Sequence, residues 1–122
     1  MRLRSLRGNR MIRVINVKKD FPTTDYALYL IDQEIAYSKA IGNLAIVVIH
    51  GYGSKGKGGV IKEAIKHYLP ELKKKTIITD YIHGENWGET NPVRKKLCEI
   101  CPELILHENL QCLNSGVTII WV

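Results

Sequence analysis

One segment decides the fold: Leu44-Ala-Ile-Val-Val-Ile-His-Gly-Tyr-Gly-Ser-Lys-Gly-Lys-Gly-Gly-Val-Ile-Lys-Glu-Ala-Ile-Lys-His-Tyr-Leu69. Residues 44–49 are all apolar, which is typical of a strand covered on both faces and predicts a central place in a partly parallel sheet. Residues 59–69 carry apolar side chains at helical spacing and end before Pro70, so they predict an amphipathic helix. Between these two elements, five of the nine residues 51–59 are glycine.

A glycine-rich loop between a strand and a helix is typical of an anion-binding site, because it directs backbone N–H groups and the positive end of the helix dipole at one point. Lys55 and Lys57 add positive charge to the loop, and Lys62 adds more in the first turn of the helix. The ring of Tyr52 either stacks on an exposed base or packs on the helix. We therefore predict a site for the phosphate of a nucleic acid. Its residues are His50, Gly51, Tyr52, Gly53, Ser54, Lys55, Gly56, Lys57, Gly58, Gly59 and Lys62.

The flanking segments complete an alternation of strands and helices. β-branched residues and local breaks predict strands at 11–17, 76–82 and 116–122, and helices at 25–41 and 92–100. Gly42 is placed to end the first helix, and Asn91 followed by Pro92 to begin the last one. Residues 103–115 show no clear pattern. The order β-α-β-α-β-(α)-β predicts an α/β fold, a two-layer sandwich with a mixed sheet.

Length and charge fit one basic domain. With 122 residues and 45% hydrophobic content, the chain is long enough for a single core. A net charge of +6 favours a nucleic-acid partner. Four of the positive charges lie within residues 1–10, which we expect to form a basic, disordered arm ahead of a single domain at 11–122. The alternative is that the domain begins at Met11 and that the preceding residues come from an upstream start.

The chain has no feature of a membrane or secreted protein. No apolar run approaches the ~20 residues that a membrane-spanning helix needs, and the first ten residues lack the apolar core of a secretory signal. The three cysteines cannot all pair within one molecule, as is typical of a reducing compartment. We therefore expect a cytoplasmic protein with no membrane partner.

The motifs resemble those of the Smr (small MutS-related) domain family. Residues 49–69 are similar to the family signature, a strand ending in His-Gly-x-Gly followed by glycines and a helix. Residues 114–121, Asn-Ser-Gly-Val-Thr-Ile-Ile-Trp, are similar to its closing strand. The resemblance implies a fold similar to the C-terminal domain of translation initiation factor three. It also implies nucleic-acid binding, and in several members endonuclease activity on branched DNA or on RNA.

The first strand departs from the family pattern. Family members commonly end this strand in Asp-Leu-His-Gly, and by this match Asn16 stands for the acidic residue and Lys18 for the histidine. The change removes the obvious metal ligand and the obvious general base, while Lys18 adds a cation for phosphate. Two hypotheses follow: an endonuclease that uses Mg²⁺ or Mn²⁺, with His50 transferring the proton, or a DNA- or RNA-binding module without catalysis.

Three further patterns remain open. Residues 51–57 match the first part of a Walker A motif, but Gly58 stands where Ser or Thr should hold magnesium, which leaves a small nucleotide-binding protein as an alternative. A zinc site is an alternative for four residues at near zinc-knuckle spacing, Cys98, Cys101, His107 and Cys112. Substitute metal ligands are available only from Asp20, Asp80, His83, Glu85 and Glu89, which otherwise read as ordinary loop residues. Trp87, in the same loop, either stacks on a base or packs inside.

Overall fold

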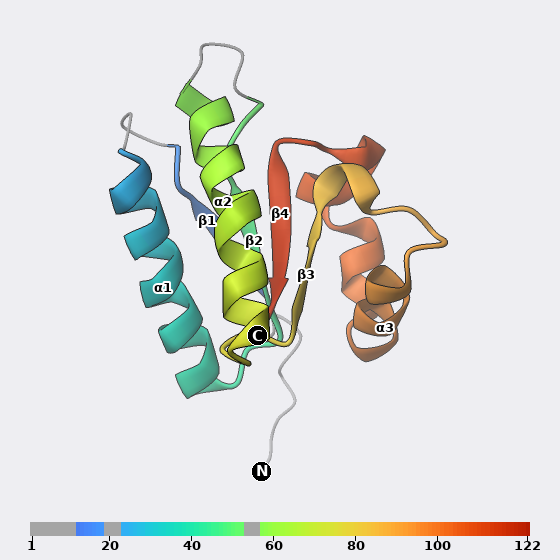
Figure 1. Ribbon diagram of the computed structural model, residues 1–122. Coiled ribbons are helices and arrows are strands. Elements are labelled where there is room, and N and C mark those ends of the chain that lie inside the picture. The colour runs from blue at the N-terminus through green and yellow to red at the C-terminus, as the bar shows by residue number, and fades with distance from the viewer. Residues whose placement is uncertain (1–11, 19–22, 53–56) are drawn as a thin grey trace.

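Four strands form one mixed sheet in the computed structural model, which describes residues 12–18, 23–52 and 57–122, with only the backbone at 57 and 58 (Figure 1). The predicted arm, residues 1–10, and loop residues 53–56 lie outside the described residues. The strands are β1 (Ile12–Asn16), β2 (Ala45–Ile49), β3 (Asp80–His83) and β4 (Val117–Trp121). Their order is β1-β2-β4-β3, with β1 parallel to β2 and β4 antiparallel to both of its neighbours. The predicted central position of residues 44–49 is therefore confirmed.

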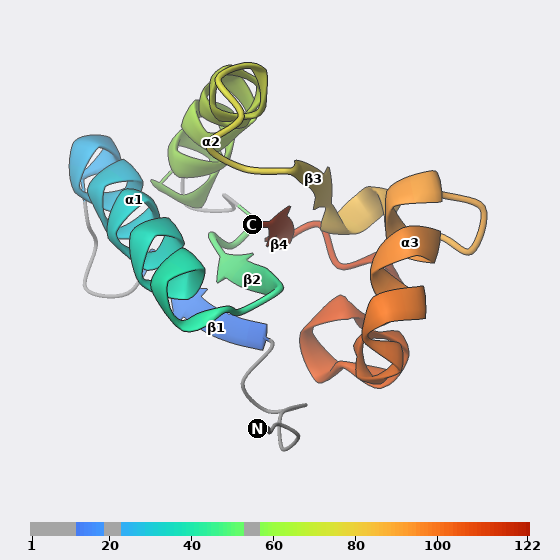
Figure 2. The same ribbon diagram turned by 90° about the horizontal axis from the view of Figure 1, so that it is seen from below.

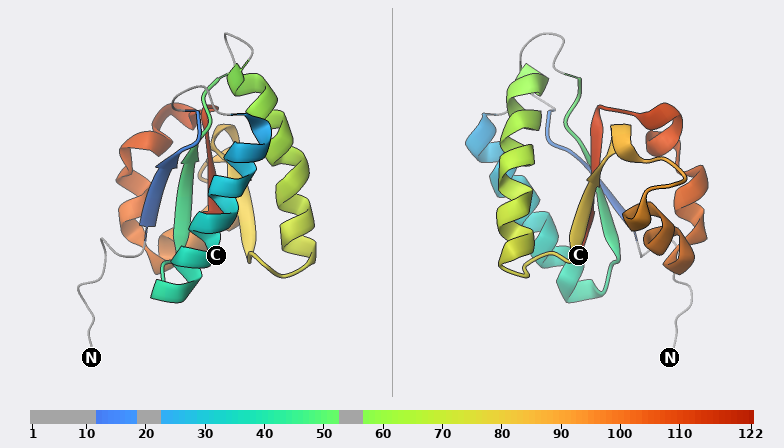
Figure 3. Two further views of the ribbon diagram at one scale, coloured as in Figure 1. Left: turned by 90° about the vertical axis from the view of Figure 1, so that its left-hand side faces the viewer. Right: turned by 45° about the vertical axis from the view of Figure 1, so that its right-hand side comes forward.

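Helices cover both faces of this sheet (Figures 2 and 3). Helices α1 (Thr24–Ile41) and α2 (Lys57–Lys74) pack on one face, around a core that includes Ile31, Ile46 and Ile65. Helix α3 (Pro92–Ile100) and the 3-10 turns η2 (Gly84–Asn86), η3 (Pro102–Leu106) and η4 (Glu108–Leu113) lie on the other. The α/β fold with a mixed sheet is thus confirmed. The predicted sandwich had two layers, and α3 with the 3-10 turns adds a third one on the second face of the sheet.

Local signals place the ends of α1 and α3 as expected. The hydroxyl of Thr23 accepts a hydrogen bond from the N–H of Tyr26 at 3.1 Å and caps α1. Gly42 ends that helix with φ of 78°, a conformation that glycine adopts without strain. The side chain of Asn91 accepts from the N–H groups of Val93 and Arg94, and Pro92 occupies the first turn of α3.

Two predicted boundaries are wrong, and they have one cause. Helix α2 does not stop before Pro70 but continues to Lys74, and β3 begins at Asp80 rather than at residue 76. Proline removes one helical hydrogen bond, at a cost of about 3 kcal/mol in a helix interior. Continuing the helix buries Leu72 at the end of the core, a gain of roughly 2 kcal/mol that helps to offset this cost. Residues 75–79 then form the turn that the longer helix requires.

Within residues 12–18, 23–52 and 57–122, none of the helices combines the length and the apolar composition that crossing a bilayer requires.

The turn after β3 depends on a close backbone approach. A Cβ atom added to Gly84 would lie 1.8 Å from the carbonyl oxygen of Asn114, which no rotation of a side chain can relieve. Gly88, in the same connection, has open space around the corresponding position.

We expect Gly84→Ala to lower the free energy of unfolding by roughly 3 kcal/mol, because the backbones of two segments must separate. Gly88→Ala is the matched control and should change it by less than about 1 kcal/mol. Urea denaturation of both variants measures the difference. Equal stability of the two variants would contradict the observed packing of the turn at Gly84 against residue 114.

Candidate functional site

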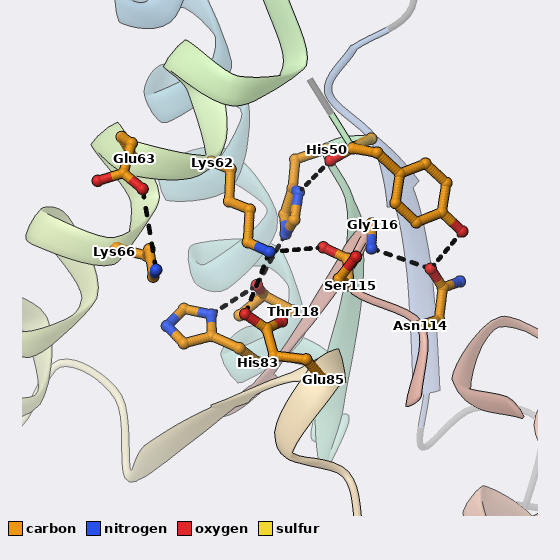
Figure 4. A network of polar contacts seen from close by, with 12 residues as sticks. His50, Lys62, Glu63, Lys66, His83, Glu85, Asn114, Ser115, Gly116 and Thr118 are labelled. Carbon is orange, nitrogen blue, oxygen red and sulfur yellow. Dashed lines mark hydrogen bonds and ion pairs between the residues drawn. The ribbon is translucent and has the colours of Figure 1, made fainter. Parts of the chain in front are cut away.

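Polar side chains converge at the edge of the sheet where β2 ends (Figure 4). Thr118 of β4 lies between two strands, paired with Val48 of β2 on one side and with His83 of β3 on the other. Successive side chains of a strand point to opposite faces, so Thr118 shares its face with Ile120, which packs under α1 and α2. His50 follows the last residue of β2 at the same edge. The register of the sheet therefore brings Thr118, His83 and His50 together beneath α2.

His50 lies below the surface of this site. The residue is 0% exposed, and both nitrogens of its ring have partners. Nδ1 is 3.0 Å from the carbonyl oxygen of Gly51, and Nε2 is 2.9 Å from the hydroxyl oxygen of Thr118. Burial lowers the pKa of His50, which favours the neutral ring at pH 7. Direct proton transfer to a ligand needs an accessible nitrogen, so this conformation does not support the expected role of His50 as the group that meets the leaving oxygen.

Lys62 connects three segments instead of standing free. Its ammonium group donates to the carbonyl oxygen of Ser115 at 2.8 Å and lies 3.1 Å from Oε2 of Glu85. Since α2 begins at Lys57, Lys62 belongs to the second turn of the helix and not to the first. Burial alone would raise the pKa of Glu85, but hydrogen bonds from its own backbone N–H and from Lys62 lower it overall. Lys62 therefore brings positive charge to the site while two protein oxygens hold it in place.

In the turn after β2, the first backbone N–H groups are already hydrogen-bonded, so a ligand would meet side chains there. The N–H groups of His50 and Gly51 both donate to the carbonyl oxygen of Gly116, each at 3.0 Å, so neither is free for a phosphate. Gly51 has φ of 80°, and the exposed side chain of Lys18 passes directly over it, 2.9 Å from where a Cβ would stand. A larger residue at position 51 would displace Lys18. The side chain of Lys18 thus brings a positive charge immediately beside the turn.

Tyr52 packs on the segment before β4 rather than on the helix. Its hydroxyl donates to Oδ1 of Asn114 at 2.7 Å, and its ring lies against Gly116. The residue remains 68% exposed. Between this ring and the first half of α2 lies an open groove of about 600 Å³. Its lining consists of Tyr52, Gly59, Val60, Lys62, Glu63 and Lys66.

Part of the predicted phosphate site falls outside this description. Gly53, Ser54, Lys55 and Gly56 are not among the described residues, and of Lys57 and Gly58 only the backbone is described, as the start of α2. Gly59 is in the groove. The first N–H groups of an α-helix have no partner within it, and Gly59 and Val60, in the first turn of α2, are among the residues that line the groove.

The other predicted sites do not assemble. Within the described part of the chain, no three His, Cys, Asp or Glu side chains form a group that fits a metal ion. Of the zinc candidates, Cys101 is buried in the core with a pKa raised to about 11 by burial, and Cys112 is exposed. His107 uses Nδ1 to accept the N–H of Asn109. The structure therefore does not bring the four zinc candidates together.

The residues considered as substitute metal ligands do not lie together. His83 and Glu85 join the site described above, whereas Asp80 forms an ion pair with Lys73 at the far end of β3 and Glu89 is exposed. Asp20 lies outside the described residues. Trp87 is 5% exposed, packs in the core with α3 and has Arg94 over its ring, so it does not stack on a ligand.

Sequence reasoning missed three contributors to the site, Asn114, Ser115 and Thr118. The signal for Thr118 was present, because the closing segment Gly116-Val-Thr118 is part of the resemblance. Ser115 acts through its backbone carbonyl, for which a sequence carries no signal.

Comparison with known proteins identifies the fold. The chain is similar to the crystal structure of the Smr domain of Thermus thermophilus MutS2, with a TM-score of 0.54 and 17% identity over 89% of this chain and 95% of that one. No protein-family model matches the sequence, and no curated protein matches it either. At this identity the likeness shows the fold, and it confirms at that level the resemblance drawn from the motifs.

Burial of His50 predicts a dependence of stability on pH. The folded state holds the pKa of His50 below its ordinary value of 6.5. Below pH 6.5 the unfolded chain therefore binds more protons than the folded one. The free energy of unfolding is therefore retained above pH 6.5 and falls as the pH drops towards the folded pKa, by up to about 1.4 kcal/mol per pH unit for one proton.

We expect His50→Gln to be less stable than the unmodified protein at pH 7.5 and to lose less stability between pH 7.5 and pH 5.5. His67→Gln, on the exposed side of α2, is the control and should keep the original slope. Urea titrations at several pH values give these slopes. An unchanged slope in His50→Gln would show that this ring does not contribute.

Proposed function

We propose that this chain, which has the fold of an Smr domain, binds nucleic acid by its phosphate backbone. The observation that carries the proposal is the groove between Tyr52 and α2, which Lys62 and Lys66 line and which adjoins the turn covered by Lys18. A basic, open groove with an exposed aromatic ring at its side suits an extended polyanion better than a compact substrate. The net charge of +6 supports the same partner.

The lysines in and beside this groove contribute to the proposed binding in different ways. Lys18 makes no ion pair with a described residue and is exposed, so it can meet a phosphate directly. Lys66 is 41% exposed and lies 3.8 Å from Glu63, a loose pair that a phosphate can displace. Lys62 stays bonded to Glu85 and Ser115 and contributes its field rather than a direct contact. In our proposal Lys55, from the loop, and Lys57, the first residue of α2, add further positive charge for phosphate.

The first strand supports binding over metal-dependent cleavage. Where the family resemblance places an acidic residue and a histidine, this chain has Asn16 and Lys18. The side chain of Asn16 accepts the backbone N–H of Lys18 at 3.0 Å and shapes the strand end. The edge therefore gains a positive charge and loses two metal-binding groups, which strengthens attraction for phosphate. We place the protein in the cytoplasm, where its free thiols suit a reducing environment.

We expect the double variant Lys18→Ala/Lys66→Ala to weaken binding to short DNA and RNA strands by on the order of tenfold at about 0.1 M salt. The logarithm of affinity should also fall less steeply with the logarithm of salt, by about one unit for each lost phosphate contact. Fluorescence anisotropy of labelled oligonucleotides measures both quantities.

Two controls sharpen this experiment. Lys75→Ala removes the same kind of charge just beyond the other end of α2 and should leave both quantities nearly unchanged. ATP and GTP should not compete with the oligonucleotides. Equal losses in the Lys75 and Lys18/Lys66 variants would mean that binding is diffuse, and competition by a nucleotide at comparable concentration would favour the Walker-type alternative.

A further inference from the structure

The hydroxyl of Thr118 lies between two histidine rings. Its oxygen is 2.9 Å from Nε2 of His50 and 2.9 Å from Nδ1 of His83 (Figure 4). His50 is fully buried at the end of β2, whereas His83, at the end of β3, is partly exposed. The three side chains form one hydrogen-bonded chain from the interior of the domain to its surface.

The direction of each hydrogen bond in this chain follows from its buried end. The carbonyl of Gly51 can only accept, so Nδ1 of His50 carries the hydrogen. Burial keeps this ring neutral, which leaves Nε2 with a lone pair that accepts the hydroxyl hydrogen of Thr118. The Thr118 oxygen then accepts from Nδ1–H of His83. Nε2 of His83 is thereby left with its lone pair, and it has no hydrogen-bond partner within the described parts of the chain.

Charged groups from several elements surround this free nitrogen. Helix α2 contributes Lys62, Lys66 and Glu63, the turn after β3 contributes Glu85, and His50 stands behind Thr118. Burial is the main cause that lowers the pKa of His83, and the two lysines lower it further, while the two glutamates raise it. The ring is therefore mostly neutral near pH 7. Lys62 and Lys66 also line the proposed binding groove, so His83 lies next to that groove.

We propose that His83 is a catalytic proton acceptor in the cleavage of RNA, an inference that rests on the proposed binding of nucleic acid in the adjacent groove. Nε2 of His83 removes the proton from a ribose 2′-OH, and the 2′ oxygen forms a bond to the neighbouring phosphorus. The bond from phosphorus to the 5′ oxygen breaks, and that oxygen takes a proton from water. The resulting hydroxide takes the proton from His83. The products are a 2′,3′-cyclic phosphate and a 5′-hydroxyl end.

The choice of RNA follows from the groups that the site provides. A single imidazole supplies a base, but the described residues offer no cluster of metal ligands to activate an external water. A ribose 2′-OH is already held beside its phosphorus, and such intramolecular placement lowers the barrier by several kcal/mol. Lys62 and Lys66 lie near His83, and in this proposal their positive charge stabilises the negative charge that the phosphorane gains. DNA lacks the 2′-OH and should bind without being cut.

Thr118 and His50 are positioning residues in this proposal. They fix which nitrogen of His83 carries the hydrogen and hold the ring in one orientation, as a second group does for histidine in other general-base systems. Thr118→Val keeps the β-branched shape but removes the hydroxyl, so Nδ1 of His83 loses its partner. Thr118→Ser restores that hydroxyl.

The test compares an RNA strand, the DNA strand of the same sequence and a 2′-O-methyl RNA strand, with EDTA present throughout. We expect cutting of the RNA alone, with a 2′,3′-cyclic phosphate end detected by mass spectrometry. His83→Ala should slow cutting by at least on the order of a hundredfold and change the dissociation constant by less than about twofold. His67→Ala is the matched control, because it removes an exposed histidine from the same helix that supplies the groove lysines.

The outcomes separate this inference from the proposed function. Absence of oligonucleotide binding would overturn both, whereas RNA binding without cutting, equal cutting of DNA, cutting that needs a divalent metal or full activity in His83→Ala would overturn only the role of His83. Thr118→Val should lower kcat and move the pH–rate profile, and Thr118→Ser should recover both. Thermal unfolding of each variant verifies that it is folded, and an unchanged pH profile in a folded Thr118→Val would remove the positioning role.

Discussion

The position of β4 between β2 and β3 is the constraint on which the site depends. Thr118 has Val48 as its partner on one side and His83 on the other, so a single residue serves both halves of the sheet. Side chains alternate between faces along a strand, and a slip of one residue would turn Thr118 away from α2. The register is held by the buried apolar partners that follow it, Ile46 with Ile120 and Val47 with Ile119. The hydrophobic core therefore fixes the geometry of the polar chain at its edge, and the site needs no separate scaffold.

Close backbone approach and satisfied polar groups complete this arrangement. Gly84 brings the turn after β3 against residue 114, and this places Glu85 where it meets Lys62. Lys62 in turn bonds the carbonyl of Ser115, so α2, the turn after β3 and the segment before β4 are joined through one ammonium group. Buried polar groups are costly unless they are paired, and a paired network holds its members in fixed positions. The same contacts therefore hold the charges of Lys62 and Glu85 in fixed positions near His83.

Local chemistry in the sequence predicted most of the elements, whereas the site depends on contacts that sequence does not record. The caps at Thr23, Gly42 and Asn91 act on neighbours a few residues away, and the continuous apolar run of β2 indicates by itself that the strand is buried. The sequence did not predict that α2 continues through Pro70. Proline is a local signal for the end of a helix, and the burial of Leu72, a tertiary effect, overrides it. The sequence marked His50 as a candidate site residue, but its depth below the surface follows from its packing against Thr118, 68 residues away. His83 and Glu85 looked like loop residues because only the fold shows that β3 ends beside α2.

In our proposal, Lys18 just after β1 and His83 at the end of β3 supply different chemical groups to the same site. In this fold the carboxyl ends of β1, β2 and β3 and the amino end of β4 meet at one edge, so a chemical group can be supplied from any of them. Lys18 gives the β1 side a charge that attracts phosphate but cannot act as a base while it is protonated. In our proposal the base comes from β3 instead, where His83 carries a tautomer set by its hydrogen bond to Thr118. His50 stays in the interior, where its hydrogen bond to Thr118 helps to fix the orientation of that hydroxyl and, through it, of His83. The function of such a domain depends on the chemical groups at this edge more than on the fold.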